Sequence, residues 1–172
     1  AVFLQGAIEG AHVFTNSGTI SSGGTAFRVT QGAPVATPTY QLTNSGTIST
    51  SGTGLAVDFT GLPVTLVSTG SVTSAGATAM RVGTGSTITI GGKVQAAGAN
   101  PIALALEGTA SQITLNEGAR LLGDISALDG TNTWTDGQKH RVILAAADNA
   151  SYYYDFEPAH FRFFIGTDET ER

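Results

Sequence analysis

The heptapeptide Thr-Asn-Ser-Gly-Thr-Ile-Ser stands at residues 15–21 and again at residues 43–49. Looser copies follow around Gly70 and Gly92, and a degenerate copy lies around Gly118. Counted from glycine to glycine, the five copies are 28, 24, 22 and 26 residues apart. Periods of about 20 to 50 residues are typical of one supersecondary unit per repeat. The sequence therefore predicts a repeat protein.

Each repeat contains three short runs in which apolar and small polar residues alternate. One run follows the marker glycine, as in Thr19 to Ser21. Another follows a second glycine, five or six residues later, and an example is Leu55 to Phe59. A third run, such as Ile88 to Ile90, precedes the next marker. Because a period of two is that of a half-buried strand, each repeat is predicted to hold three strands joined by turns.

A unit of three short strands has too few inward side chains to fold alone, so copies of it must stack. The predicted fold is all-β, a parallel β-helix of about five coils over residues 1–130, with strands of successive coils about 4.8 Å apart. In the incomplete first coil, Phe3, Ile8 and Val13 are expected to point inward. Asp58 is expected to alternate outward, into solvent.

The composition agrees with a β-structure covered by small residues. Charged residues make up only 12% of the 172 residues, against about 25% in an average domain. Hydrophobic residues make up 41% and glycine occurs 23 times, which is adequate for a core and many tight turns. Disorder is the alternative interpretation of such a composition, but disordered chains lack regularly spaced β-branched residues.

Several function classes are disfavoured by what the chain lacks. It has no cysteine, so disulfides and thiolate metal sites are excluded. Its net charge is −5 without a basic cluster, so a nucleic-acid partner is not expected. No apolar run approaches the roughly 20 residues of a membrane helix. The chain begins at Ala1 in mid-pattern without a signal peptide, so we interpret it as a mature or excised segment of a larger protein.

The longest connection between predicted strands runs from Gln31 to Tyr40. Two prolines within it, Pro34 and Pro38, cannot donate to a strand ladder, so the stretch is predicted to be a loop leaving the coil. Loops on a rigid scaffold are where recognition commonly resides. Pro34, Pro38 and Tyr40 are therefore candidate recognition residues, and the alternative is a long turn without function.

Residues 131–172 differ in kind from the repeats. Eight of the thirteen aromatic residues lie there. An open β-helix end must be covered, so this second segment is predicted to be an aromatic cap. Val142 to Ala145 is expected to form a strand, while Tyr152 to Phe156 and His160 to Ile165 are expected to form a hairpin. An aromatic ligand-binding face is the alternative.

No constellation of residues predicts catalysis, a cofactor or a metal. The carboxylates of the regular coils do not fall at matching positions of adjacent repeats, and the histidines are scattered. These residues are Asp58, Glu107, Glu117, Asp124 and Asp129, and His12, His140 and His160. The nucleophile motif Gly-x-Ser-x-Gly and calcium-binding repeats are also absent. A non-enzyme is therefore predicted, with a polysaccharide-acting β-helix enzyme as the alternative.

Hydroxyl side chains flank the inward residue of the first run in three repeats. Thr19 and Ser21 recur as Thr47 and Ser49 and then as Ser71 and Thr73, whereas the fourth repeat has Lys93 and Gln95. Stacked coils would turn these residues into two hydroxyl rows, as an ice-binding surface needs. Because strand propensity alone explains the pattern, ice binding is kept only as an alternative.

The repeats Asn16 to Ile20 and Asn44 to Ile48, with the late stretch Leu115 to Ile125, resemble the passenger region of bacterial autotransporters of type V secretion. This resemblance covers about residues 1–130. It implies a right-handed β-helix displayed at the bacterial cell surface by a C-terminal outer-membrane barrel outside this segment.

The function that the resemblance implies is that of a non-catalytic shaft or binding face of an adhesin or a self-associating passenger. Its partners would be a host or matrix surface, protein or glycan, or another copy of the chain. A phage-tail structural protein is a further alternative, because other surface β-helices share Gly-Thr-Ile turns.

Overall fold

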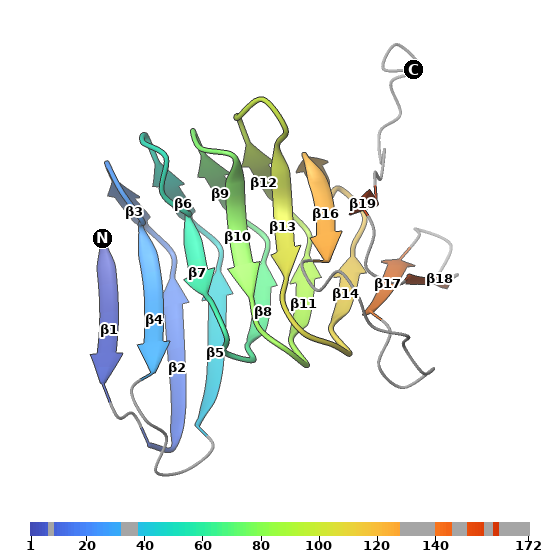
Figure 1. Cartoon of the computed structure of the whole chain (residues 1–172), viewed down its shortest axis with the longest axis horizontal. Coiled ribbons are helices and arrows are strands. Elements are labelled where there is room, and N and C mark those ends of the chain that lie inside the picture. Colours follow the sequence, from blue (N-terminus) through green and yellow to red (C-terminus); the bar gives the residue numbers. More distant parts are fainter. Residues whose placement is uncertain (7–8, 32–37, 128–139, 146–150, 157–159, 162–172) are drawn as a thin grey trace.

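The computed structural model describes residues 1–6, 9–31, 38–127, 140–145, 151–156 and 160–161, and in the last three ranges and at residue 127 it describes the backbone alone. Every regular element within these residues is a β-strand. The strands form three sheets, each of which runs along the longest axis of the molecule (Figure 1). The predicted all-β class is confirmed.

The strands are named by sheet, in their spatial order. Sheet A consists of β1 (Val2–Gly6), β4 (Phe27–Gln31), β7 (Val57–Phe59), β10 (Thr78–Val82), β13 (Ile102–Leu106), β16 (Asp124–Ala127) and β19 (His160–Phe161). Sheet B consists of β2 (Ala11–Asn16), β5 (Thr39–Asn44), β8 (Thr65–Ser68), β11 (Thr87–Ile90), β14 (Gln112–Leu115), β17 (His140–Ala145) and β18 (Ser151–Phe156). Sheet C consists of β3 (Thr19–Ser22), β6 (Thr47–Thr50), β9 (Ser71–Ser74), β12 (Lys93–Ala96) and β15 (Arg120–Leu122).

Each coil of the chain contributes one strand to sheet B, then one to sheet C, then one to sheet A. Five complete coils follow one another in this way, from β2, β3 and β4 to β14, β15 and β16. Strands of successive coils pair in parallel and keep the register of the repeat, so Ile20 lies beside Ile48, which lies beside Val72. The predicted parallel β-helix of about five coils is therefore confirmed.

The marker glycines lie directly above one another where sheet B turns into sheet C. A Cβ atom added to Gly46 would overlap the carbonyl oxygen of Gly18, and the same overlap recurs from Gly70 to Gly46 and from Gly92 to Gly70. Gly18, Gly46, Gly70 and Gly92 do not have a positive φ, whereas the fifth marker, Gly118, has a φ of 84° and no close contact. Close approach of the coils therefore explains the need for glycine at Gly46, Gly70 and Gly92, and backbone conformation explains it at Gly118.

The asparagine of the heptapeptide forms a ladder inside the same turn. Asn16 Nδ2 donates to Asn44 Oδ1 at 2.8 Å, and Asn44 Nδ2 donates to Ser68 Oγ at 3.1 Å. Asn16 is 8% and Asn44 is 1% exposed. Since buried amide groups must find partners, stacking equivalent amides from coil to coil satisfies them and fixes the register.

Inward side chains from the three sheets form one continuous core. Leu42, Leu66 and Ile88 lie next to one another along sheet B and are fully buried. From sheet A, the rings of Phe27 and Phe59 lie with centroids 5.8 Å apart and are tilted by 33°. Fully burying one such side chain contributes roughly 1.5 to 3 kcal/mol, so contacts between coils are a main source of stability.

Two inward residues expected in the first coil are wrong. Phe3 is 58% and Val13 is 66% exposed. Val2 pairs with the inward Phe27, so its neighbour Phe3 lies on the outer face. Phe14 pairs with the inward Leu42, so its neighbour Val13 also lies on the outer face. Ile8 lies outside the described residues.

The C-terminal segment adds strands to two of the sheets. β17 pairs in parallel with β14, which confirms the strand expected there. The expected hairpin between residues 152–156 and 160–165 is wrong, because β18 pairs antiparallel with β17 and β19 pairs antiparallel with β16. The aromatic side chains of this segment lie outside the described part of the chain, so the aromatic cap remains a prediction.

Candidate binding face on sheet B

The outer face of sheet B carries two rows of side chains, because each outward residue pairs with its counterpart one coil on. Within the five coils every member of both rows is uncharged, and beyond them Gln112 pairs with Arg141 of β17. The first row consists of Val13, Gln41, Thr65, Thr87 and Gln112, all exposed, and the second of Thr15, Thr43, Val67, Thr89 and Thr114. The rows step by about 4.8 Å per coil. Sheet B therefore presents a regular neutral surface of hydroxyl, amide and aliphatic groups.

A hollow of about 260 Å³ interrupts this face where β2, β5 and β8 begin. Its lining includes Val13, Thr39, Gln41 and Thr65. A smaller hollow of about 110 Å³ adjoins it and is lined in part by Pro63. Both are lined by Thr39, Tyr40 and Thr65, so we treat them as one surface depression and call it the sheet B groove.

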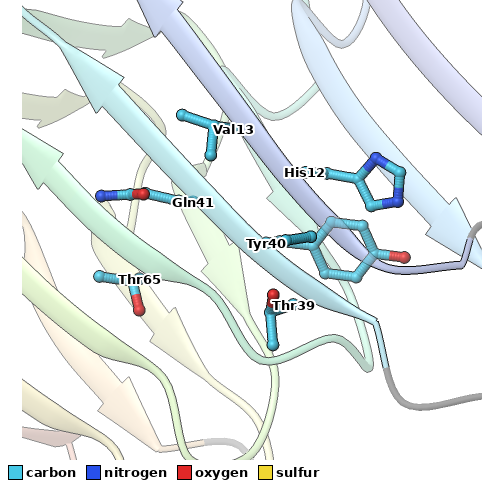
Figure 2. A pocket seen from close by; sticks show the side chains of 7 residues that line it. His12, Val13, Thr39, Tyr40, Gln41 and Thr65 are labelled. Carbon is cyan, nitrogen blue, oxygen red and sulfur yellow. The ribbon is translucent and has the colours of Figure 1, made fainter.

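His12 and Tyr40 stand side by side at one end of the sheet B groove, with Val13, Gln41 and Thr65 on neighbouring strands (Figure 2). The two rings stack with centroids 5.7 Å apart and an interplanar angle of 26°. His12 Nε2 lies 2.9 Å from the carbonyl oxygen of Glu9. His12 and Tyr40 lie on the side of β2 and β5 opposite to Val13 and Gln41, and Tyr40 is part of the buried core.

Tyr40 is an inward residue of β5 and is 3% exposed. Its ring lies 6.0 Å from that of Phe59. Its hydroxyl is buried and has no hydrogen-bond partner among the described residues. Burial raises the pKa of the Tyr40 phenol because the charged phenolate is poorly solvated there. Tyr40 therefore shapes the groove as a neutral packing residue.

The three candidate recognition residues are thus placed differently. Pro34 lies outside the described residues. Pro38 is buried and lines the smaller hollow next to Thr39. Tyr40 belongs to β5 and not to the loop, because the strand begins at Thr39. Of the three, Pro38 and Tyr40 border the sheet B groove, whereas the exposed lining comes from residues that the loop hypothesis did not name.

Sequence reasoning missed Thr39, Gln41 and Thr65 because it weighed outward residues only in the first run of each repeat. The signal was available in the third run, where threonine or glutamine recurs at outward positions in every repeat from the second onward. The groove could not be predicted from the sequence, because its shape depends on where the first residues of β2, β5 and β8 lie relative to one another.

Charged side chains gather instead on the outer face of sheet A. The expectation that Asp58 is solvated is wrong, because its side chain is only 3% exposed and lies 2.6 Å from Arg28 Nε. The backbone N–H of Thr60 donates to the same carboxylate at 3.1 Å. Arg28 and Asp58 pair in register, so stacking of the coils brings a cation beside the acid.

A second carboxylate on this side is also engaged. Glu107 accepts a hydrogen bond of 2.7 Å from the backbone N–H of Gly61 and lies 3.8 Å from Arg81 Nε. Glu107 thereby links a turn of the second coil to the fourth. Both acids have structural roles, since each ties together residues of different coils.

Within the described ranges, no three His, Cys, Asp or Glu residues come together as a metal site would require. The described residues also contain no helix that is long and apolar enough to cross a membrane.

No protein-family model, curated protein or solved structure matches the chain. The resemblance to autotransporter passengers remains a prediction.

Proposed function

We propose that this chain is a non-catalytic β-helical segment of a cell-surface protein, and that it serves as the shaft or the binding face of an adhesin or a self-associating passenger. One observation carries the proposal: five coils stack in register and present a continuous neutral face with a groove in it. Repeat scaffolds commonly use such extended surfaces for binding.

The charged groups support the non-catalytic part of the proposal. General acid–base catalysis by carboxylates needs groups that are free to exchange protons with a substrate. Asp58 is instead buried against Arg28 and Thr60, and Glu107 holds the Gly61 N–H. The alternative of a polysaccharide-cleaving enzyme predicts turnover that is lost in Asp58→Asn, and a screen of polysaccharides and esters with both proteins tests it.

The surface location is proposed from the resemblance to autotransporter passengers. In that arrangement the segment is extracellular and is held to the bacterial cell by an outer-membrane barrel. The hydroxyl- and amide-rich face of sheet B suits a partner met in water, either a host or matrix surface or another copy of the chain. A gene that encodes a barrel after this segment would support the arrangement, whereas neighbouring phage-tail genes would favour the tail alternative.

Two glutamines in the same row provide the test of the binding face. Gln41 lines the sheet B groove, while Gln112 lies three coils further on and outside it, and both are exposed. Beads coated with the chain are mixed with immobilised matrix proteins, with glycans and with one another. We expect Gln41→Arg to reduce bead adhesion at least tenfold and Gln112→Arg to leave it unchanged.

If beads coated with the natural chain do not adhere, the binding role is refuted and only the role as a shaft remains. Equal loss in both variants would place recognition along the whole row and not in the groove. Circular dichroism spectra of the two variants should match that of the natural chain, because both side chains point away from the core.

A second function, binding to ice, is favoured by one observation. Four of the five members of the second row of sheet B are threonines. In the second to fourth coils, four of the six positions of the two rows carry a hydroxyl, namely Thr43, Thr65, Thr87 and Thr89. A freezing-point difference between growth and melting of an ice crystal measures this activity. Loss of that difference in Thr89→Lys would support ice binding, and its absence in the natural chain would refute it.

A further inference from the structure

The row of outward residues at the start of the sheet C strands ends in two cations. In register, Thr19, Thr47 and Ser71 are followed by Lys93 and then by Arg120. Lys93 is half-buried and Arg120 is exposed. Adjacent strands lie about 4.8 Å apart, so the two side chains rise from neighbouring positions on one face.

Among the residues whose side chains the structure describes, these two cations have no carboxylate partner, in contrast to Arg28 and Arg81. Arg28 pairs with Asp58 and Arg81 lies near Glu107, whereas neither Lys93 nor Arg120 forms an ion pair with any described residue. Like charges directly opposite each other on a sheet are destabilising. A pair placed this way therefore weakens the fold unless something else meets it.

The surroundings of the pair are hydroxyl, amide and aliphatic groups. Ser71 and Thr73 lie on one side, in the preceding strand, and Gln95 is two residues from Lys93 on the same face. Leu122 pairs with Gln95 and is 40% exposed. A ligand over this end of sheet C would meet two positive charges, several hydrogen-bonding groups and a small apolar surface.

We propose that the sheet C end formed by Ser71, Thr73, Lys93, Gln95, Arg120 and Leu122 binds an acidic polysaccharide, a chain of hydroxylated sugars that carry carboxylate or sulfate groups. The anionic groups lie over Lys93 and Arg120. The sugar hydroxyls exchange hydrogen bonds with Ser71, Thr73 and Gln95. The proposal rests on the proposed binding role and names the partner class for a second face.

Other anionic partners fit less well. Duplex DNA is typically held by about 6 to 10 phosphate contacts, and anionic membranes attract clusters of about 4 to 8 Lys or Arg residues. Sheet C offers two cations beside a hydroxyl row. A polymer with few charges and many hydroxyl groups matches a surface with two cations and a row of hydroxyls.

The test measures binding of the purified chain to polygalacturonate, to heparin, to neutral dextran, to duplex DNA and to vesicles containing phosphatidylserine. We expect saturable binding to at least one acidic polysaccharide that weakens as salt rises, since the Debye length is only about 10 Å at 0.1 M. Binding to dextran should be at least tenfold weaker. Preferential binding to DNA or vesicles would overturn the assignment to a polysaccharide.

Charge variants decide whether the pair is responsible. Lys93→Gln combined with Arg120→Gln should weaken binding about tenfold at low salt, a change of the size expected for two charges near the protein surface. Lys93→Arg keeps the charge and should bind as the natural chain does. Ser71→Lys places a third cation next to Lys93 and should strengthen binding.

The stability of the double variant should equal or exceed that of the natural chain, because it removes like-charge repulsion, and thermal melting checks this. Unchanged binding in the double variant would refute the proposal, and so would loss of binding in Lys93→Arg. Bead adhesion through the sheet B groove is measured separately with Gln41→Arg. Its failure would refute the groove as the adhesive site without touching the polysaccharide result.

Discussion

Replacing Gly46 and Gly18 by alanine tests the stacking of the coils with two identical sequences in different surroundings. Both glycines lie in the same heptapeptide, and neither has a positive φ. A Cβ at Gly46 would overlap the Gly18 carbonyl oxygen and lie 2.8 Å from the Gly18 nitrogen. At Gly18, which precedes the edge strand β3 of sheet C, an added Cβ meets nothing within 4 Å.

The expected loss in Gly46→Ala has two parts. Forcing one extra carbon into a packed site costs about 1 to 3 kcal/mol. The shift also strains the hydrogen bonds from Thr47 N to Gly18 O, at 2.8 Å, and from Gly46 N to Asn16 O, at 3.1 Å, each of which contributes about 1 kcal/mol. Together the free energy of unfolding should fall by about 2 to 4 kcal/mol.

Gly18→Ala should be neutral or stabilising by up to about 1 kcal/mol, because it only restricts the unfolded chain. Urea unfolding followed by circular dichroism measures both variants, and for a chain of this size the loss in Gly46→Ala corresponds to a fall in Tm of roughly 10 °C. If the two variants unfold within about 0.5 kcal/mol of each other, close stacking is not the reason for the glycine repeat.

Three further perturbations test other parts of the structure. Asp58→Asn should lower the free energy of unfolding by about 1 to 3 kcal/mol, because the ion pair with Arg28 is lost. A double-mutant cycle with Asp58→Asn, Arg28→Gln and the variant that carries both changes measures the coupling energy between Asp58 and Arg28. Stability should fall as pH rises above about 10, where the unfolded chain loses the Tyr40 proton but the buried phenol keeps it, and Tyr40→Phe should remove that dependence without loss of stability. Deleting residues 33–35 leaves as many connecting residues as join β10 to β11, so melting should be unchanged, and reduced bead adhesion would support a recognition role for the loop.

The repeat made most of the fold predictable from the sequence. Each run that alternates clearly, such as Ile88 to Ile90, became a strand with the expected inward residues. The first coil failed because β2 has apolar residues on both faces, Val13 and Phe14, and periodicity cannot choose between them. Phe14 points inward because it pairs with the inward Leu42. This contact joins two adjacent coils, so the pattern within one strand does not reveal it.

The error at Asp58 had a remedy in the sequence. Phe27-Arg28-Val29 and Val57-Asp58-Phe59 occupy the same place in successive repeats, so opposite charges were already aligned. The pairing of Arg28 with Asp58 was overlooked because each repeat was considered separately. The wrong hairpin has a different cause. Residues 152–156 and 160–165 are close in the sequence, which suggested that they pair with each other, but β18 pairs with β17.

In a β-helix, equivalent outward positions of successive coils form a row of side chains. The order of charges along such a row indicates whether the charges are paired within the chain. On sheet A, Arg28, Asp58 and Arg81 alternate in sign, an order that stabilises the chain by itself. On sheet C, Lys93 and Arg120 repeat the same sign, an order that costs stability. Because strand spacing is the same in both sheets, geometry cannot explain the difference. On sheet A the acid is paired with a cation of its own chain, whereas no described residue forms an ion pair with the two cations on sheet C. This contrast is the reason why we propose an external anion for sheet C.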